Sequence, residues 1–208
     1  MEEIFYKICD NFIVSWDPEE ISAGFQSINR PHEYHPYYDP SGDAHWQLYP
    51  TNVAFGRNFY PNFKAECLEV AEKLKSIQEK LRDERLSGNE SFPVNRLTET
   101  FLNHKIIPNK VNLLKTIPGK DIELHYDSTR DLCINIGLKN SNKWQTIISE
   151  DPNIKNFESS KKNSFLMNDG DAYIILINNP HVATCLNKQD LKSTRFLITY
   201  TMTMPTTN

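Results

Sequence analysis

The sequence predicts a mainly β protein, an antiparallel sandwich or barrel, with one long helix in front of its strands. Several short segments rich in Ile, Leu, Tyr and Thr follow one another after residue 110, and no helical pattern separates them. Helical spacing of apolar residues is confined to residues 61–87. The 208-residue length suits one domain, with an irregular region at 1–60, the helix at 61–87 and the strand-rich core at 94–204.

The first region is rich in Pro, Tyr and His, and we expect it to be irregular. Its aromatic residues are predicted to form a lid over the mouth of the barrel, because loops of this kind often line sites. These residues are Tyr34, Tyr37, Tyr38, Trp46 and Tyr49. Zinc binding is a weaker interpretation of the same segment, based on His32 and His35 with Asp39 or His45.

The helix is predicted from apolar residues at three- and four-residue spacing, with Lys, Glu and Gln between them. Pro61 suits the first helical position, and Gly88 suits the end of the helix. The apolar residues are Phe63, Cys67, Val70, Ala71, Leu74, Ile77 and Leu81. We expect this apolar face to pack on a sheet.

The strands are predicted from runs of apolar and β-branched residues that end at turn signals. Pro118-Gly119 separates the first two, and Asn168-Asp169-Gly170-Asp171 precedes a later one. A polar stretch at 139–163 contains one or two further strands around Trp144–Ile148. The main predicted strands are 110–117, 122–127, 132–138, 172–178 and 196–204.

Composition excludes several classes of partner. The chain has 23 Lys and Arg residues against 27 Asp and Glu, so it lacks the basic excess that nucleic-acid binding needs. The longest apolar run, Tyr173–Ile177, is far below the ~18 residues of a membrane span. The acidic start, Met1-Glu2-Glu3, is unlike a secretory signal, and we expect a cytoplasmic protein. The four cysteines include no C-x-x-C pair; Cys133 and Cys185 lie in apolar runs and are expected to be inert buried thiols.

A candidate metal site begins with His125-Tyr126-Asp127. In an extended segment residues i and i+2 share a face, so the imidazole and the carboxylate can converge. His181 follows Pro180 directly after an apolar strand, where it can supply a third ligand. Two histidines and one carboxylate form the facial triad that leaves open positions on ferrous iron. A surface strand end is the alternative for His125 and Asp127, and a capped loop histidine is the alternative for His181.

Arg195 opens the last strand and shares a predicted face with Leu197 and Thr199. Burying an arginine there is costly without an anionic partner, and a dicarboxylate ligand would match its guanidinium. The alternative is an exposed arginine at the start of an edge strand. His104 is most simply a structural residue.

These pieces together resemble the iron(II)/2-oxoglutarate-dependent dioxygenases, including phage and bacterial prolyl- or aspartyl-hydroxylase-like members. The resemblance covers about residues 110–204. It is carried by the segments 111–119 and 122–127, by Gly170-Asp171-Ala172-Tyr173 leading to Pro180-His181, and by Arg195.

The resemblance implies a double-stranded β-helix, or jelly-roll barrel, that uses Fe(II), O2 and 2-oxoglutarate. His125, Asp127 and His181 would be both the metal ligands and the catalytic centre. Arg195 would bind the distal carboxylate of 2-oxoglutarate. Thr199 or Tyr200 would assist, with Asn135 a weaker candidate for the carboxylate next to the metal.

Departures from family patterns narrow the expected reaction. Halogenating members lack the acidic ligand that Asp127 supplies here, which favours hydroxylation. Thr201 stands where nucleobase demethylases carry a second arginine. Arg130 resembles the D-x-x-R of some relatives and, with Tyr126 and Trp144, is a candidate substrate contact.

We therefore expect a hydroxylase of an aliphatic C–H in an amino-acid residue or small molecule, which converts 2-oxoglutarate to succinate. The expected partners are a small-molecule or peptide substrate, with no nucleic acid and no membrane. A structural ion pair of Arg130 with Asp131 or Glu150 is an equal alternative to its substrate role. The rival function is a metal-free or inactive jelly-roll module that binds a ligand such as a sugar.

Overall fold

The structure is a computed structural model that describes residues 4–21, 46–48, 63–88, 95–116, 118–119, 121–127 and 131–202. The tyrosines of the expected lid, the His32–His45 pattern and Arg130 lie outside these residues. Trp46, also expected in the lid, begins the strand β2 (Trp46–Leu48), which pairs with β3 (Val111–Thr116).

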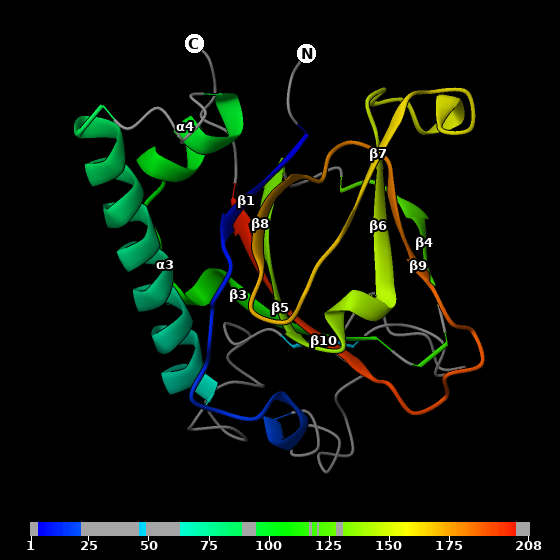
Figure 1. Cartoon of the computed structure of the whole chain (residues 1–208), viewed down its shortest axis with the longest axis horizontal. Coiled ribbons are helices and arrows are strands. Elements are labelled where there is room, and N and C mark those ends of the chain that lie inside the picture. The colour runs from blue at the N-terminus through cyan, green and yellow to red at the C-terminus, as the bar shows by residue number, and fades with distance from the viewer. Residues whose placement is uncertain are drawn as a thin grey trace.

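Two antiparallel sheets face each other across the molecule (Figure 1). The larger sheet has the order β1-β8-β5-β10-β3-β2, and the smaller sheet has the order β4-β9-β6-β7. The larger sheet comprises β1 (Phe5–Cys9), β8 (Ala172–Leu176), β5 (Leu132–Lys139), β10 (Arg195–Met202), β3 (Val111–Thr116) and β2 (Trp46–Leu48). The smaller sheet comprises β4 (Ile122–His125), β9 (His181–Cys185), β6 (Trp144–Ser149) and β7 (Lys162–Leu166).

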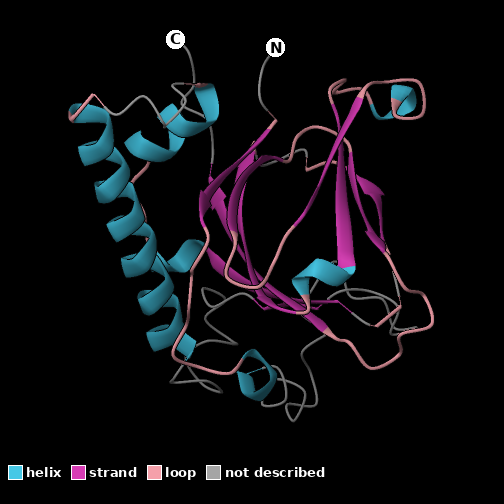
Figure 2. Cartoon of the chain, in the orientation of Figure 1, coloured by secondary structure: helices cyan, strands magenta, loops and turns pink. Residues whose placement is uncertain are grey.

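The chain alternates between the two sheets. From β3 to β10 each strand lies in the sheet opposite to its predecessor, except that β6 and β7 are neighbours in the smaller sheet. This strand order is consistent with the expected jelly roll. The expectation of a mainly β protein with few helices is confirmed (Figure 2).

Three elements differ from the sequence prediction. Phe5–Cys9 and Trp46–Leu48, within the region expected to be irregular, form β1 and β2, which pair with β8 and β3 at the two edges of the larger sheet. Arg96–Asn103, within the region expected to hold strands, forms helix α4. A capping box starts α4: the Asn95 side chain accepts from the Thr98 N–H, and Thr98 Oγ1 accepts from the Asn95 N–H. Eight residues are too few for apolar periodicity to reveal this helix.

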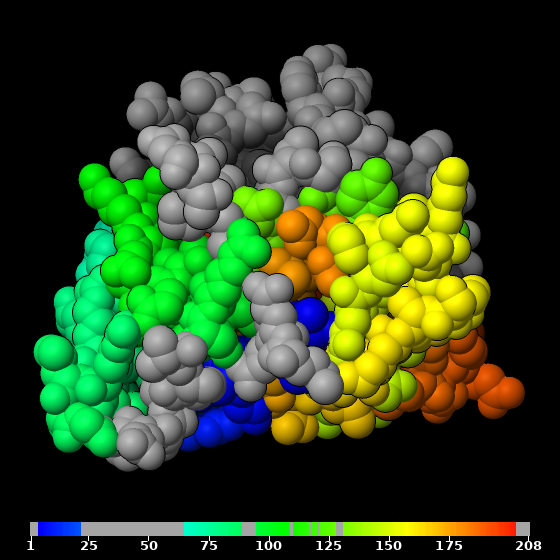
Figure 3. All heavy atoms as spheres, turned by 90° about the horizontal axis from the view of Figure 1, so that it is seen from above, coloured from blue at the N-terminus to red at the C-terminus, as the bar shows by residue number. Residues whose placement is uncertain are grey.

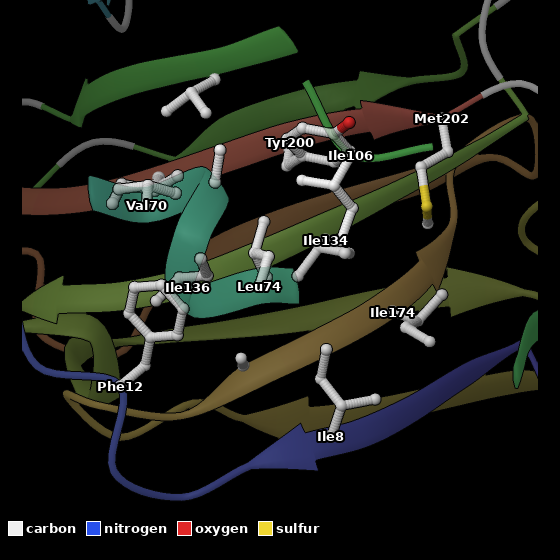
Figure 4. Packing of buried hydrophobic residues seen from close by; sticks show 14 of the residues in the cluster. Ile8, Phe12, Val70, Leu74, Ile106, Ile134, Ile136, Ile174, Tyr200 and Met202 are labelled. Atoms are coloured by element: carbon white, nitrogen blue, oxygen red, sulfur yellow. The ribbon is translucent and has the colours of Figure 1, made fainter. Parts of the chain in front are cut away.

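Helix α3 (Phe63–Leu86) covers the outer face of the larger sheet (Figures 1 and 4). Its buried residues Val70 and Leu74 meet Ile134 and Ile136 of the sheet in one apolar cluster. Tyr200 also lies on this outer side, and its hydroxyl accepts a hydrogen bond from the Ile107 N–H at 3.0 Å. The expectation that Tyr200 assists the site is therefore wrong, because alternation along β10 turns it toward the helices.

A second apolar cluster fills part of the space between the sheets. Cys133, Ile175 and Leu197 of the larger sheet meet Ile148 and Phe165 of the smaller one. Because Leu197 points inward, Arg195 and Thr199 of the same strand share the inner face. This alternation turns the arginine toward the smaller sheet.

Figure 3 shows α3 and α4 on one side of the molecule and the 150–165 segment on the other.

None of the helices in the described ranges combines the length and apolarity needed to cross a bilayer. All four cysteines are free thiols, and Cys133 and Cys185 are buried as predicted.

Candidate metal centre and anion site

Strands β4 and β9 lie side by side (Figure 1). Their adjacent ends bring three possible metal ligands together. His125 ends β4, His181 begins β9, and the two are direct cross-strand partners. Their ring centroids lie 4.2 Å apart. Asp127 follows two residues after His125, and its N–H donates to the Ile177 carbonyl at 2.9 Å. One donor atom from each of His125, Asp127 and His181 lies within 4.8 Å of the others.

Backbone carbonyls orient both imidazoles. Nδ1 of His125 lies 2.7 Å from the Glu123 oxygen, and Nδ1 of His181 lies 2.8 Å from the Asn179 oxygen. A carbonyl oxygen can only accept, so Nδ1 is the hydrogen-bond donor in each ring, and Nε2 is the atom left to bind a metal. Histidines that bind metals characteristically donate their other N–H in this way.

The loop that carries His181 is fixed by its neighbours. The Asn179 side chain is buried and donates to the Ser149 carbonyl at 2.8 Å. The Ser149 N–H donates to the Pro180 carbonyl at 2.9 Å, which ties the loop to the end of β6. His181 is thus held next to its partner strand by contacts on both sides.

The donor set fits a catalytic metal. Two imidazole nitrogens and one carboxylate oxygen suit Fe(II) and leave positions for further ligands. Across the described ranges, this is the one group of three or more His, Cys, Asp or Glu residues that converges in this way. All three side chains are half-buried, so the site is neither fully solvated nor sealed.

Arg195 forms a second, separate feature on the inner face. It is 2% exposed and lies in β10, which is flanked by β5 and β3. The alternative of an exposed arginine on an edge strand is therefore wrong. Its Nε and Nη1 atoms are buried and have no hydrogen-bond partner. Burial lowers the pKa of Arg195 to about 10, so the guanidinium is still charged at neutral pH.

Trp144, at the start of β6 in the facing sheet, lies against this guanidinium. The Arg195 Cζ atom is 5.7 Å from the centroid of the Trp144 ring. Trp144 is 1% exposed, so the structure places it inside the sandwich.

The smaller sheet relates this arginine to the triad. Along β6, Trp144 pairs with Cys185 and Ile148 pairs with His181. The four-residue separation corresponds to ~13 Å of strand. The guanidinium of Arg195 lies at the Trp144 end of this stretch.

The remaining candidates are placed as follows. Thr199 is buried, and Asn135 is its half-buried partner on β5. Tyr126, between His125 and Asp127, is 48% exposed. The roles of these residues stay predictions.

Two polar residues near Arg195 were not predicted. Thr116 is the direct partner of Arg195 on β3, and Asn112 is the partner of Thr199. Both are buried, 3% and 5% exposed. Asn112 and Thr116, four residues apart on one face of an apolar strand, were a usable signal, but the pairing of β3 with β10 could not be read from the sequence.

No protein-family model matches this sequence, and comparison with curated protein sequences gives no match. The chain is similar in structure to an oxidoreductase of the 2OG-Fe(II) oxygenase family from Burkholderia pseudomallei, with TM-score 0.35 and 11% identity, over 45% of this chain and 42% of that one. It is similar at TM-score 0.35 and 15% identity to oxalate oxidase in complex with glycolate, over 46% and 42%. CENP-C of Drosophila melanogaster bound to CAL1 gives TM-score 0.34 and 6% identity, over 45% and 62%. The chain thus spans less than half of the first two proteins, and similarities this low support no functional conclusion.

Proposed function

We propose that this protein is a non-haem Fe(II)/2-oxoglutarate-dependent dioxygenase. It hydroxylates an aliphatic C–H of an amino-acid residue or small molecule and converts 2-oxoglutarate to succinate. The observation that carries the proposal is the combination of a convergent His125–Asp127–His181 triad with a buried Arg195 whose Nε and Nη1 atoms lack hydrogen-bond partners.

The triad would hold the metal through Nε2 of His125, Nε2 of His181 and a carboxylate oxygen of Asp127. The carbonyls of Glu123 and Asn179 keep both rings in the required tautomer. When bound, iron supplies oxidation by O2 coupled to decarboxylation of the oxo acid.

Arg195 would bind the distal carboxylate of 2-oxoglutarate. A buried cation with unsatisfied N–H donors is costly unless an anion meets it, and a carboxylate matches the guanidinium geometry. The oxo-acid end would then be directed along the inner face toward the triad. Thr199 and Asn135, which are adjacent across β10 and β5, would offer hydrogen bonds on that face.

The first test uses the chain in anaerobic solution with Fe(II) and 2-oxoglutarate. The proposal predicts a weak visible charge-transfer band that needs both additions. Under air, succinate is expected, with its yield increased by the substrate in a panel of amino acids and peptides. If neither the band nor succinate forms, the dioxygenase proposal is wrong and the metal-free binding module is favoured.

Two variants separate the proposed roles. His181→Ala should abolish retention of iron. Arg195→Ala should keep iron bound and raise the 2-oxoglutarate concentration needed for half-maximal activity. Truncating a buried carboxylate–guanidinium pair costs roughly 2 to 5 kcal/mol, which is at least ~30-fold in affinity. His104→Gln is the control for loss of a histidine away from the triad. Equal behaviour of the two site variants would contradict this division of roles.

A further inference from the structure

We propose that Trp144 is a positioning residue: its indole face holds the Arg195 guanidinium so that the arginine can present its N–H groups to a carboxylate. This inference rests on the proposed function, because the carboxylate is taken to be that of 2-oxoglutarate. Trp144, in the sheet opposite to the arginine, would then help to set the affinity for 2-oxoglutarate.

The contact joins the two sheets at the far end of the inner face. Arg195 starts β10 in the larger sheet, and Trp144 starts β6 in the smaller one. Cζ of the arginine lies 5.7 Å from the indole centroid, within the range of a cation–π interaction. Both side chains are almost completely buried, so water does not weaken the attraction.

The surroundings of Arg195 give this contact unusual weight. Among the described residues no ion pair involves Arg195, and its Nε and Nη1 lack hydrogen-bond partners. The indole therefore stabilises the buried cation electrostatically through the face of the guanidinium. This contact leaves the N–H groups at the guanidinium edge available for a ligand. A carboxylate in the same place would instead compete with the ligand for these donors.

The position of Trp144 also argues against a purely apolar role. It belongs to neither of the two apolar clusters of buried residues. Its neighbours on the inner face include Thr146 of the same strand and its cross-strand partner Cys185. A side chain that only filled space would be expected among the apolar residues.

The expected effect follows from the cation–π interaction. Trp144→Leu removes the π face and should weaken 2-oxoglutarate binding by about 5- to 30-fold. Trp144→Phe keeps a weaker π face and should give an intermediate value. Metal affinity and turnover at saturating 2-oxoglutarate should remain close to those of the unchanged protein, because the triad lies at the other end of the inner face.

The test measures 2-oxoglutarate binding calorimetrically, with Mn(II) as a redox-silent metal, and Mn(II) affinity separately. Trp16→Phe is the matched control, since it removes a tryptophan outside the site. Tryptophan fluorescence gives a second readout: the change in emission on addition of 2-oxoglutarate should be smaller in Trp144→Phe than in the unchanged and Trp16→Phe proteins.

The outcomes distinguish the two proposals. If the unchanged protein binds no 2-oxoglutarate, the proposed function fails. If it binds and Trp144→Leu binds equally well, the role of Trp144 is refuted while the function stands. Equal losses in metal affinity and turnover would also refute it, since they indicate general damage to the core. Should the leucine variant not fold, the phenylalanine variant decides: Trp144→Phe that binds 2-oxoglutarate as tightly as the unchanged protein refutes the inference.

Discussion

Replacing Arg195 by methionine should stabilise the ligand-free protein while removing its response to 2-oxoglutarate. Methionine is shorter than arginine, but it is flexible and uncharged and fills much of the same interior space. Most substitutions of a buried residue destabilise, so an increase in the free energy of unfolding would be a distinctive result. It is expected here because the guanidinium is buried and two of its donors lack partners.

The magnitude follows from the burial of the cation. Lowering of the pKa of Arg195 from 12.5 to about 10 corresponds to roughly 3 kcal/mol against the charged form. The buried cation–π contact with Trp144 offsets about 2 kcal/mol of this cost. A net gain of about 1 kcal/mol on removing the charge would raise Tm by ~2 to 4 °C in a chain of this size.

Thermal unfolding with and without 2-oxoglutarate measures both effects. The unchanged protein should unfold at a lower temperature than Arg195→Met when ligand is absent, and should gain stability when Mn(II) and 2-oxoglutarate are added. Arg85→Met is the matched control: Arg85 forms a partly exposed ion pair with Glu99, whose loss should change stability by less than about 1 kcal/mol. If Arg195→Met lowers Tm and the variant still responds to 2-oxoglutarate, Arg195 is a structural residue and the assignment of the anion site is wrong.

Three further substitutions test other parts of the structure. Gly137→Ala should lower the free energy of unfolding by about 1 to 3 kcal/mol, because a Cβ atom at this position would overlap the Asn168 carbonyl oxygen. An unchanged Tm in thermal unfolding would show that the backbone can relax to make room for the Cβ atom. Burial lowers the pKa of His104 in the folded protein, so the unfolded chain takes up a proton first as the pH falls below about 6.5, and the folded state loses stability there. The Tm of His104→Gln should therefore fall less steeply toward pH 5 than the Tm of the unchanged protein. Identical pH profiles would contradict this role of His104. Lys7→Met leaves the buried Asp171 carboxylate without its cation and should cost about 1 to 3 kcal/mol in chemical denaturation, which a variant as stable as the original protein would disprove.

The sequence predicted features that depend on local periodicity. Alternation indicated that Arg195 shares a face with Leu197, and helical spacing indicated a long helix at residues 61–87, where the structure has Phe63–Leu86. The spacing of His125 and Asp127 likewise predicted one shared direction. Each of these predictions needed only neighbouring residues and the geometry of one element.

Features that depend on the order of strands in the sheets were not accessible. The direct pairing of His125 with His181 requires β4 to lie beside β9, and the contact of Trp144 with Arg195 requires the two sheets to face each other. Trp144 was assigned to the substrate because nothing in its own segment points to an arginine 51 residues later. The strand β1 was missed for the same reason, since its partner β8 is far along the chain.

The place of β10 has a consequence for how the polypeptide acquires its structure. The final described strand is inserted between β5 and β3, so these two strands have no direct pairing until it arrives. During synthesis the larger sheet would remain split, with two open strand edges and an exposed apolar surface, until nearly all of the described chain had left the ribosome. Folding should consequently be slow and largely post-translational, and a premature stop before residue 195 should yield an aggregation-prone product rather than a smaller stable domain.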